Sequence, residues 1–460
     1  MKNYLIAIAL MLYFSSCKKS FLDAKPNSSI VNPTSISEFQ ELLDNNYVLN
    51  STGALPQMSC DDYFIVNQSS LDALDYPTYK GAYLWRKDLF GGETNIQDWN
   101  GDFNAIFYAN SVLDGLNAIS QSSANRIDYN NVKGEALFFR AYAYYDLVRN
   151  FCTVYNQKTA TSDLGLPLRT SAGIDATLKR SNLQETFDLV ISDLNTSLIL
   201  LRDDFSTVNR NRPSRSAVNA MLARVYLYMG NYTEAANAAD QCLAKYNRLI
   251  DYNTISTTKT TPFSYSTDET IFFSKQQVSY TYTTGYTTNW TTIGVDTTLL
   301  KSYSTNDLRL PIFFALNALN NYNVKRGYVG GGFYGFTGLA TDEVMLIKAE
   351  CAARANDAPT AMNTLNQLLL NRYRKGTFVP INTSNSTTAL SQVLLERRKE
   401  LVWRALRWSD LKRLNRDGAN ITLKRNLGEV TYTLTPNSSL YVFPIPDDEI
   451  VLSGIQQNIR

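Results

Sequence analysis

Adjacent acidic residues are the first candidates for chemistry in this chain. They occur as Asp61-Asp62, Asp203-Asp204 and Asp447-Asp448-Glu449. Hydrolysis of a sugar chain requires two carboxylates and no imidazole, so these groups need consideration. Catalytic carboxylates normally come from distant positions, however, and adjacent acids are usually solvated loop residues. We therefore expect that the protein is not an enzyme.

The sequence of 460 residues contains no histidine. This excludes Ser-His-Asp and Cys-His nucleophile pairs and His-ligated zinc or iron. The glycine run at 330–332 lacks the Lys-Ser/Thr of a phosphate-binding loop. The 44 basic and 42 acidic residues nearly cancel, and no basic run resembles a nucleic-acid patch. We expect no cofactor, no catalytic metal and no nucleic-acid partner; whether a structural calcium ion is bound stays open.

Aromatic residues are the side chains best suited to binding. The chain has 29 Tyr, 21 Phe and 5 Trp, and residues 247–340 combine tyrosine with threonine and glycine. Segments such as 280–286 (YTYTTGY) predict a loop-rich insertion with short strands. Loops on a rigid scaffold commonly carry binding sites, and tyrosine offers a flat surface with a polar tip.

The first residues have the pattern of an export signal. Lys2 precedes an apolar run at 4–14, which is too short to cross a bilayer, and two serines then lead to Cys17. A cysteine at this point is typical of lipoprotein cleavage and acylation, although a plain signal peptide is the alternative. We expect that residues 1–16 are removed and that acyl chains on Cys17 hold the protein at a membrane.

The other cysteines are widely spaced. They are Cys60, Cys152, Cys242 and Cys351, without any CxxC pair, so neither a metal knuckle nor a redox pair is indicated. Disulfide bonds could form in an exported protein. The alternative is that they are small buried residues, because Cys242 and Cys351 fall in apolar helical patterns.

The remaining patterns predict a mainly α-helical scaffold. Residues 97–119, 128–151 and 181–202 have apolar side chains at helical spacing. Residues 215–246 have the spacing of a tetratricopeptide helix pair, with Gly230 at the turn. A second unit around Ala349 and Ala361 repeats this spacing. The two units are not a regular array, so we expect helix pairs interrupted by long insertions.

The densest motif lies at 387–415. Leu394, Leu401 and Trp408 repeat every seven residues and predict one buried helix face. The many charges around them are expected to lie on solvated faces and to pair along the helix.

Five segments in order resemble the SusD/RagB family of outer-membrane nutrient-binding lipoproteins. They are Cys17 with Phe21-Leu22-Asp23 and Pro26; Gly134 to Ala141 (GEALFFRA); the helix pair at 215–246; Glu343 to Glu350 with Asn366 and Arg372; and Glu396 to Arg413 with the closing Phe443-Pro444-Ile445-Pro446 and Glu449-Ile450. The chain departs from the family in having Arg404-Ala405 where Glu-Gly is usual. Its Gly165-Leu166-Pro167-Leu168 element follows an insertion, and it ends without the usual aromatic tail.

The resemblance implies one SusD-like domain over 17–460, anchored at the cell surface in the outer membrane. Its function would be to bind a nutrient, most often an oligosaccharide, and to deliver it to a SusC-like TonB-dependent transporter. The candidate ligand contacts are Tyr83, Trp85, Tyr282, Tyr286 and Trp290, whereas Trp99 is expected to be structural. The alternatives are a peptide or other non-glycan nutrient, or a tetratricopeptide-type scaffold that binds only proteins.

Overall fold

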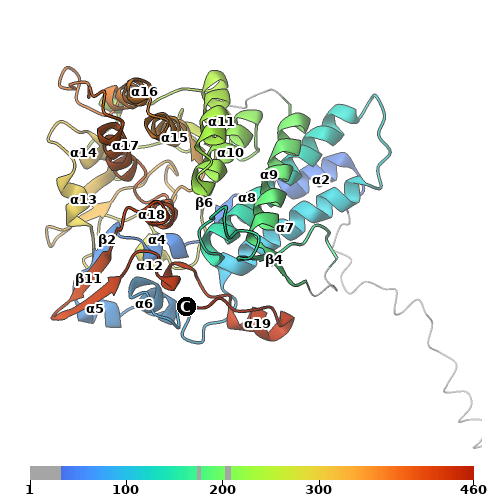
Figure 1. Cartoon of the computed structure of the whole chain (residues 1–460), viewed down its shortest axis with the longest axis horizontal. Helices are drawn as coiled ribbons and strands as arrows, with labels where there is room; N and C mark the ends of the chain where they lie inside the picture. The colour runs from blue at the N-terminus through green and yellow to red at the C-terminus, as the bar shows by residue number, and fades with distance from the viewer. Residues whose placement is uncertain (1–32, 174–177, 203–208) are drawn as a thin grey trace, which may run out of the picture.

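The computed structural model describes residues 33–173, 178–202 and 209–460. The predicted signal peptide, Cys17 and the Asp203-Asp204 pair lie outside these residues. The architecture is mainly α-helical, as predicted (Figure 1). Among the described helices, none is both long and apolar enough to span a membrane.

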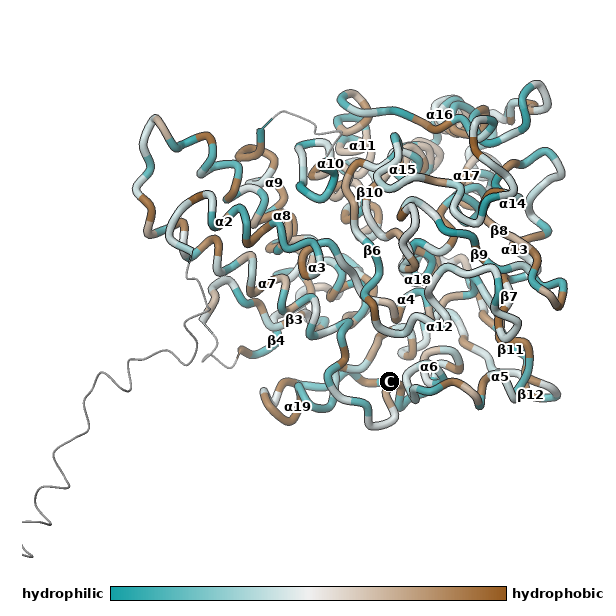
Figure 2. Tube along the Cα trace, turned by 180° about the vertical axis from the view of Figure 1, so that it is seen from behind, coloured by the Kyte–Doolittle hydropathy of each residue, from teal (hydrophilic) through white to brown (hydrophobic). Residues whose placement is uncertain are grey.

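One half of the molecule is a stack of four helices (Figures 1 and 2). They are α2 (Ile36–Leu43), α7 (Gln97–Leu116), α8 (Arg126–Phe151) and α9 (Leu183–Leu200). The predicted helices at 97–119, 128–151 and 181–202 are therefore confirmed within a few residues. Helix α9 begins two residues later than expected, because the Asn182 side chain caps it and Glu185 completes a capping box.

The tetratricopeptide-like pairs form the upper part of Figure 1. They are α10 (Arg215–Met229) with α11 (Tyr232–Lys245), and α15 (Thr341–Arg354) with α16 (Ala358–Leu370). Gly230 ends α10 with φ 82°, a left-handed conformation that favours glycine. Although the insertion separates the two pairs in sequence, α11 packs directly against α15. The helices therefore form one continuous scaffold.

The insertion at 247–340 consists of loops and short elements, as predicted. Its elements are η2 (Tyr252–Thr254), β5 (Thr270–Phe272), β6 (Lys275–Gln276), α12 (Thr281–Thr284), β7 (Ile293–Val295), α13 (Thr297–Lys301), α14 (Arg309–Phe313), β8 (Phe314–Leu316), β9 (Tyr322–Val324) and β10 (Leu339–Ala340). Each sheet in the described part of the chain has two strands. Strand β6 pairs in parallel with β1 (Ser51–Thr52), and β7 pairs antiparallel with β2 (Tyr63–Ile65). The insertion is thus fastened to the N-terminal segment.

The remaining described elements lie before, between and after these helices in the chain. They are α3 (Asn46–Leu49), α4 (Leu55–Ser59), α5 (Gln68–Asp72), α6 (Pro77–Tyr83), β3 (Leu164–Pro167), β4 (Arg180–Asn182), α17 (Ser386–Glu400), α18 (Arg407–Arg416), β11 (Leu423–Leu427), β12 (Val430–Leu434), η3 (Ser439–Tyr441) and α19 (Asp447–Ser453).

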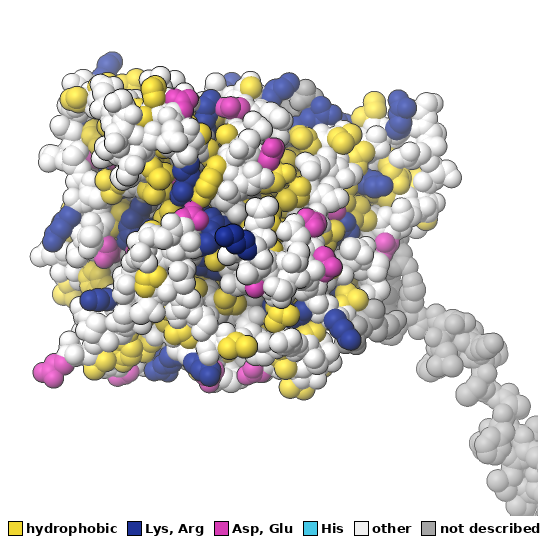
Figure 3. All heavy atoms as spheres, in the orientation of Figure 1, with side chains coloured by type: hydrophobic (Ala, Val, Ile, Leu, Met, Phe, Trp, Pro, Cys, Tyr) yellow, Lys and Arg dark blue, Asp and Glu magenta, His cyan; other side chains and the backbone are white. Residues whose placement is uncertain are grey.

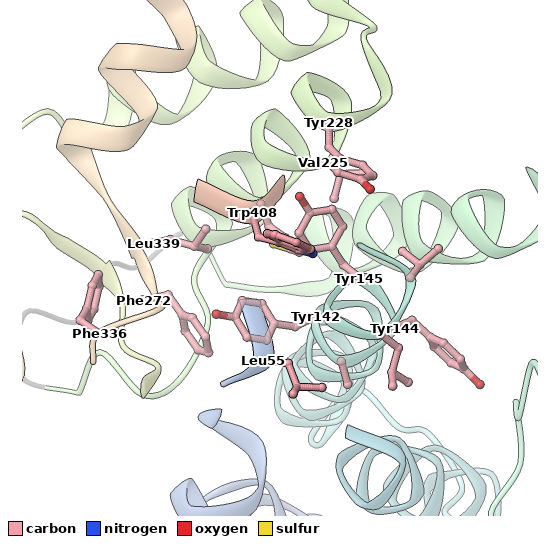
Figure 4. Packing of buried hydrophobic residues seen from close by; sticks show 14 of the residues in the cluster. Leu55, Tyr142, Tyr144, Tyr145, Val225, Tyr228, Phe272, Phe336, Leu339 and Trp408 are labelled. Carbon is pink, nitrogen blue, oxygen red and sulfur yellow. The ribbon is translucent and has the colours of Figure 1, made fainter. Parts of the chain in front are cut away.

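A large aromatic core joins the helices to the insertion (Figure 4). The rings of Tyr142 on α8 and Phe272 on β5 lie 5.3 Å apart, and Trp408 stacks on Phe443 at 5.6 Å. Trp99 is 1% exposed, so its predicted structural role is confirmed. The four cysteines at 60, 152, 242 and 351 are free and buried, which favours the packing alternative over disulfide bonds.

The prediction for 387–415 is wrong in two respects. The helix ends at Glu400 and a second one begins at Arg407. Between them, Trp403 and Ala405 have φ values of 63° and 55°, which break the helix. The charges are also mostly buried, because carboxylates and arginines from distant segments pair with them. On the outer surface in Figure 3, charged and apolar side chains are interspersed.

Candidate functional site

A row of aromatic rings connects α6 with the loop around α12, which lie beside each other in Figures 1 and 2. We call this row the aromatic ridge; it consists of Tyr76, Tyr79, Tyr280, Tyr282, Trp290 and Phe333. Neighbouring ring centroids are 4.9–6.3 Å apart. Tyr76 is 51% exposed, and all the other rings except that of Tyr79 are partly exposed.

Tyr282 and Trp290 form the flattest part of the ridge. Their rings are 4.9 Å apart and only 18° from parallel, and the edge of Phe333 meets Trp290 at 5.9 Å. The backbone NH of Tyr282 donates to the Tyr79 hydroxyl at 3.0 Å, and Asn317 Nδ2 donates to the carbonyl of Trp290 at 2.7 Å. The stacked pair is therefore held in place while part of each ring stays accessible.

Two hydroxyls of the ridge, those of Tyr79 and Tyr280, stay protonated. Burial raises the pKa of Tyr79 to about 12 and also raises that of Tyr280, so neither phenol ionises at neutral pH. Tyr280 donates to Glu93 Oε2 at 3.3 Å. The ridge thus combines apolar faces with polar edges, an arrangement suited to a polar ligand with flat apolar faces.

Tyr83 and Trp85 have a different place from the one predicted. They are 1% and 4% exposed, and the guanidinium carbon of Arg425 lies 3.8 Å and 4.6 Å from their ring centroids. Trp85 Nε1 donates to the Ser59 carbonyl at 2.9 Å, and the Tyr83 hydroxyl accepts from the NH of Ile65 at 2.8 Å. Because their faces are covered by this packing, neither ring can stack on a ligand.

Tyr286 is also an interior residue, at 5% exposure. It lines a cavity of about 30 Å³ together with Trp403 and Arg404. A space of this size holds a water molecule rather than a sugar ring. Of the five predicted ligand contacts, the structure therefore brings Tyr282 and Trp290 together at the surface and covers the other three.

Residues 20–227 match the family described as "Starch-binding associating with outer membrane", and residues 339–459 match the SusD family. The chain belongs to the SusD/RagB family. It is 25% identical to SusD-like protein P2 of Formosa agariphila over 416 residues, covering 77% of each chain.

Solved structures of SusD proteins have the same fold. A SusD superfamily protein from Bacteroides thetaiotaomicron matches with a TM-score of 0.74 and 21% identity, over 93% of this chain and all of the other. A SusD-like carbohydrate binding protein from Bacteroides vulgatus matches with a TM-score of 0.67 and 20% identity, over 92% of this chain and 97% of the other.

The departure from the usual SusD/RagB pattern at 404–405 has a structural counterpart. Arg404, in the place of the usual glutamate, donates to both oxygens of Asp342 at 2.9 and 2.6 Å. Ala405, in the place of the usual glycine, keeps a left-handed φ of 55°. The charge of the side chain at 404 is reversed, and in this chain the buried ion pair of Arg404 with Asp342 links the turn to α15.

One carboxylate cluster in the described part of this SusD-like chain has the ligand types of a metal site. Glu269, Asp342 and Glu400 have oxygens within 4.8 Å of one another, and all three are buried. Arg372 contacts Glu269 and Glu400 at 2.8 and 2.7 Å, and Arg404 contacts Asp342. Because the guanidinium groups occupy the sides where a cation would bind, the arrangement fits an internal ion-pair network rather than a metal centre.

The supporting rings of the ridge, Tyr76 and Tyr79, were not predicted as site residues from the sequence. Tyr76 and Tyr79 are three residues apart on or beside α6, and their rings meet Tyr280 at 6.1 and 5.5 Å. The i, i+3 spacing of two tyrosines was the available signal. Their partner lies some 200 residues further along the chain, so the spacing alone did not reveal the ridge.

Proposed function

We propose that this protein binds a glycan at the outer-membrane surface, without turning it over, and passes it to a SusC-like TonB-dependent transporter. The observation that carries the proposal is the partly exposed stack of Tyr282 on Trp290. Aromatic faces of this kind suit the apolar faces of sugar rings, while neighbouring hydroxyls and amides suit their polar edges.

Family membership supports the same proposal. One matching family is described as starch-binding and as associating with the outer membrane, and one structural neighbour is described as carbohydrate binding. The signal pattern before Cys17 predicts the lipid anchor, and the resemblance to the family implies the transporter partner. A peptide or another nutrient in the same complex is the alternative ligand.

The contacts of the Asp61-Asp62 pair are consistent with binding without turnover. Asp61 accepts from Arg398 at 2.5 Å and from Arg407 at 2.8 Å, and these two arginines hold its pKa below the usual range against the opposing effect of burial. Asp62 is buried and accepts from Gln57 at 3.2 Å. Neither carboxylate belongs to the aromatic ridge, where a glycan would lie.

A glycan panel tests the proposal. Purified protein is titrated with oligosaccharides of several backbones, neutral and acidic, and the mixtures are then examined for hydrolysis products. We expect retention without new products. Trp290→Ala should weaken binding about five- to thirtyfold, because one aromatic face contributes roughly 1–2 kcal/mol.

Tyr373→Ala is the matched control. Tyr373 is also a partly exposed tyrosine, but its ring contacts Phe378 rather than the ridge. Its loss should leave glycan affinity unchanged. Binding of peptides but no glycan, or equal effects of the two substitutions, would contradict the proposal.

A further inference from the structure

A second hollow lies next to the ridge, between α3, α7 and the segment that follows β6. Its volume is about 220 Å³. We call it the amide pocket; its lining residues are Tyr47, Val48, Ser51, Gln97, Gly101, Asn104, Lys275, Gln277, Val278 and Ser279. It is large enough for a single sugar-sized group.

Gln277 is the residue of the pocket whose side chain indicates ligand binding. It is only 8% exposed, yet neither Oε1 nor Nε2 of its amide has a hydrogen-bond partner. Such an orphaned buried amide costs roughly 1–3 kcal/mol, so natural proteins seldom keep one without a reason. The Nε2 atom of Gln277 lies 2.5 Å from the position that a Cβ on Gly101 would take. A side chain at position 101 of α7 would therefore clash with the Gln277 amide, and glycine avoids this clash.

The other walls of the pocket have the chemistry of a neutral sugar site. Asn104 and Gln97 add two amides, and Lys275 is the one charged side chain of the lining. Tyr47 is 67% exposed and Val278 is 39% exposed, which gives the pocket an apolar face. Amides that both donate and accept, beside a flat ring, match the alternating hydroxyls and apolar faces of a pyranose.

The amide pocket and the aromatic ridge are continuous along the chain. Gln277 to Ser279 line the pocket, and Tyr280 of the ridge follows directly. Lys275 lines the pocket while its Nζ lies 5.7 Å from the ring centroid of Tyr334. That ring in turn contacts Phe333 of the ridge at 5.7 Å.

We propose that the amide pocket is a second sugar subsite and that the ligand is an oligosaccharide long enough to occupy the pocket and the ridge together. This inference rests on the proposed function. It also limits the ligand class, because a mono- or disaccharide bound at the stacked rings of Tyr282 and Trp290 leaves the pocket empty.

The test compares two adjacent glutamines. Gln276 and Gln277 are both buried and both have unpaired amide atoms, but only Gln277 lines the pocket. Gln277→Met and Gln276→Met each replace an orphaned amide by an apolar chain of similar length. Binding is measured by calorimetry against a size series, from disaccharide to hexasaccharide, of the best-bound backbone in the panel.

We expect Gln277→Met to weaken binding of the longest oligosaccharides about tenfold, the value of one or two lost hydrogen bonds, and to leave the disaccharide unaffected. Gln276→Met should change neither. Thermal midpoints of both variants should stay level or rise, because an unpaired buried amide is removed. Asn104→Ala provides a second variant at an exposed position if Gln277→Met folds poorly.

The outcomes separate the two proposals. If Trp290→Ala abolishes binding at every length while Gln277→Met and Asn104→Ala change nothing, the second subsite is overturned and the proposed function stands. If Trp290→Ala also changes nothing, or no oligosaccharide binds, both fail. A uniform loss at all lengths in Gln277→Met would overturn the subsite too, because it would indicate a disturbed fold.

Discussion

Arg404 donates to both carboxylate oxygens of Asp342, at 2.9 and 2.6 Å. Both residues are buried, and the rings of Tyr328 and Phe336 lie 4.6 and 5.4 Å from the guanidinium carbon. This pair fastens the turn between α17 and α18 to the start of α15. It therefore joins the C-terminal helices to the tetratricopeptide-like pairs.

Asp342→Ala should destabilise the protein by about 3–5 kcal/mol, because Arg404 would stay buried without its counter-charge. The double variant Asp342→Leu/Arg404→Met should lose less than Asp342→Ala, since neither charge is left unpaired. Urea unfolding of the three proteins measures both effects. A loss under about 1 kcal/mol in the single variant would show that the pair is not important for stability.

Ala405→Gly should stabilise the protein by up to about 1 kcal/mol. Ala405 has a left-handed φ of 55°, a conformation that is strained for a residue with a Cβ but not for glycine. The greater entropy of glycine in the unfolded chain offsets part of this gain. The matched control is Ala352→Gly within α15, which should instead destabilise by a similar amount. If both substitutions destabilise equally, the backbone at Ala405 carries no strain.

The helical scaffold could be predicted because its signals are local. Apolar spacing located α7, α8 and α9, and Gly230 marked the turn between α10 and α11. The burial of the charges at 396–413 could not be predicted. Their partners, such as Arg372 for Glu400 and Glu350 for Arg413, come from other segments, and a charged run in sequence looks the same whether water or an opposite charge faces it.

The candidate site could also be predicted only in part, because the partners of its residues lie far away in the sequence. Composition indicates a tyrosine-rich loop, and the resemblance to the SusD/RagB family points to Tyr282 and Trp290 within it. What covers Tyr83 is Arg425, which lies 342 positions further along the chain. An aromatic residue before the first helix pair therefore has the same sequence signal whether it binds a ligand or holds an arginine in the core.

Tyr83→Leu should separate these two roles. Losing the ring removes the contact with the Arg425 guanidinium and the acceptor for the Ile65 NH, so a loss of about 2–4 kcal/mol in stability is expected. Glycan affinity should not change in the fraction that stays folded. Thermal unfolding and calorimetric titration of the same sample measure both quantities. Weaker binding with an unchanged melting temperature would return Tyr83 to the binding site.

Cys17→Ala should release the protein from the membrane fraction. Without the thiol there is no site for the acyl chains, and none of the described helices could replace them as an anchor. Fractionation of cells that express each form, followed by immunoblotting, measures the change. Cys60→Ala, at a buried cysteine, is the control and should stay with the membrane. Retention of Cys17→Ala would favour the plain signal peptide.

Asp98→Asn should flatten part of the pH dependence of stability. Burial raises the pKa of Asp98 to about 7, and the nearby charge of Asp146 adds to this rise while the NH of Leu55 opposes it. The Oδ1 atom accepts from Leu55 at 2.8 Å, whereas Oδ2 has no hydrogen-bond partner, so no donor stabilises a negative charge on that oxygen.

The sign of the effect follows from proton binding. Between about pH 4 and pH 7 the folded protein keeps a proton on Asp98 that the unfolded chain has released, so stability falls as the pH rises through this window, by at most about 1.4 kcal/mol per pH unit. Asparagine keeps the acceptor for Leu55 but cannot ionise. Relative to the native protein, Asp98→Asn should therefore gain stability from pH 5 to pH 8. Urea unfolding of both proteins at several pH values measures the difference between their free energies of unfolding. Glu135 and Glu269 also have raised pKa values, but they are present in both proteins, so their contributions cancel in this difference. A constant difference across that range would show that Asp98 is already ionised in the folded protein.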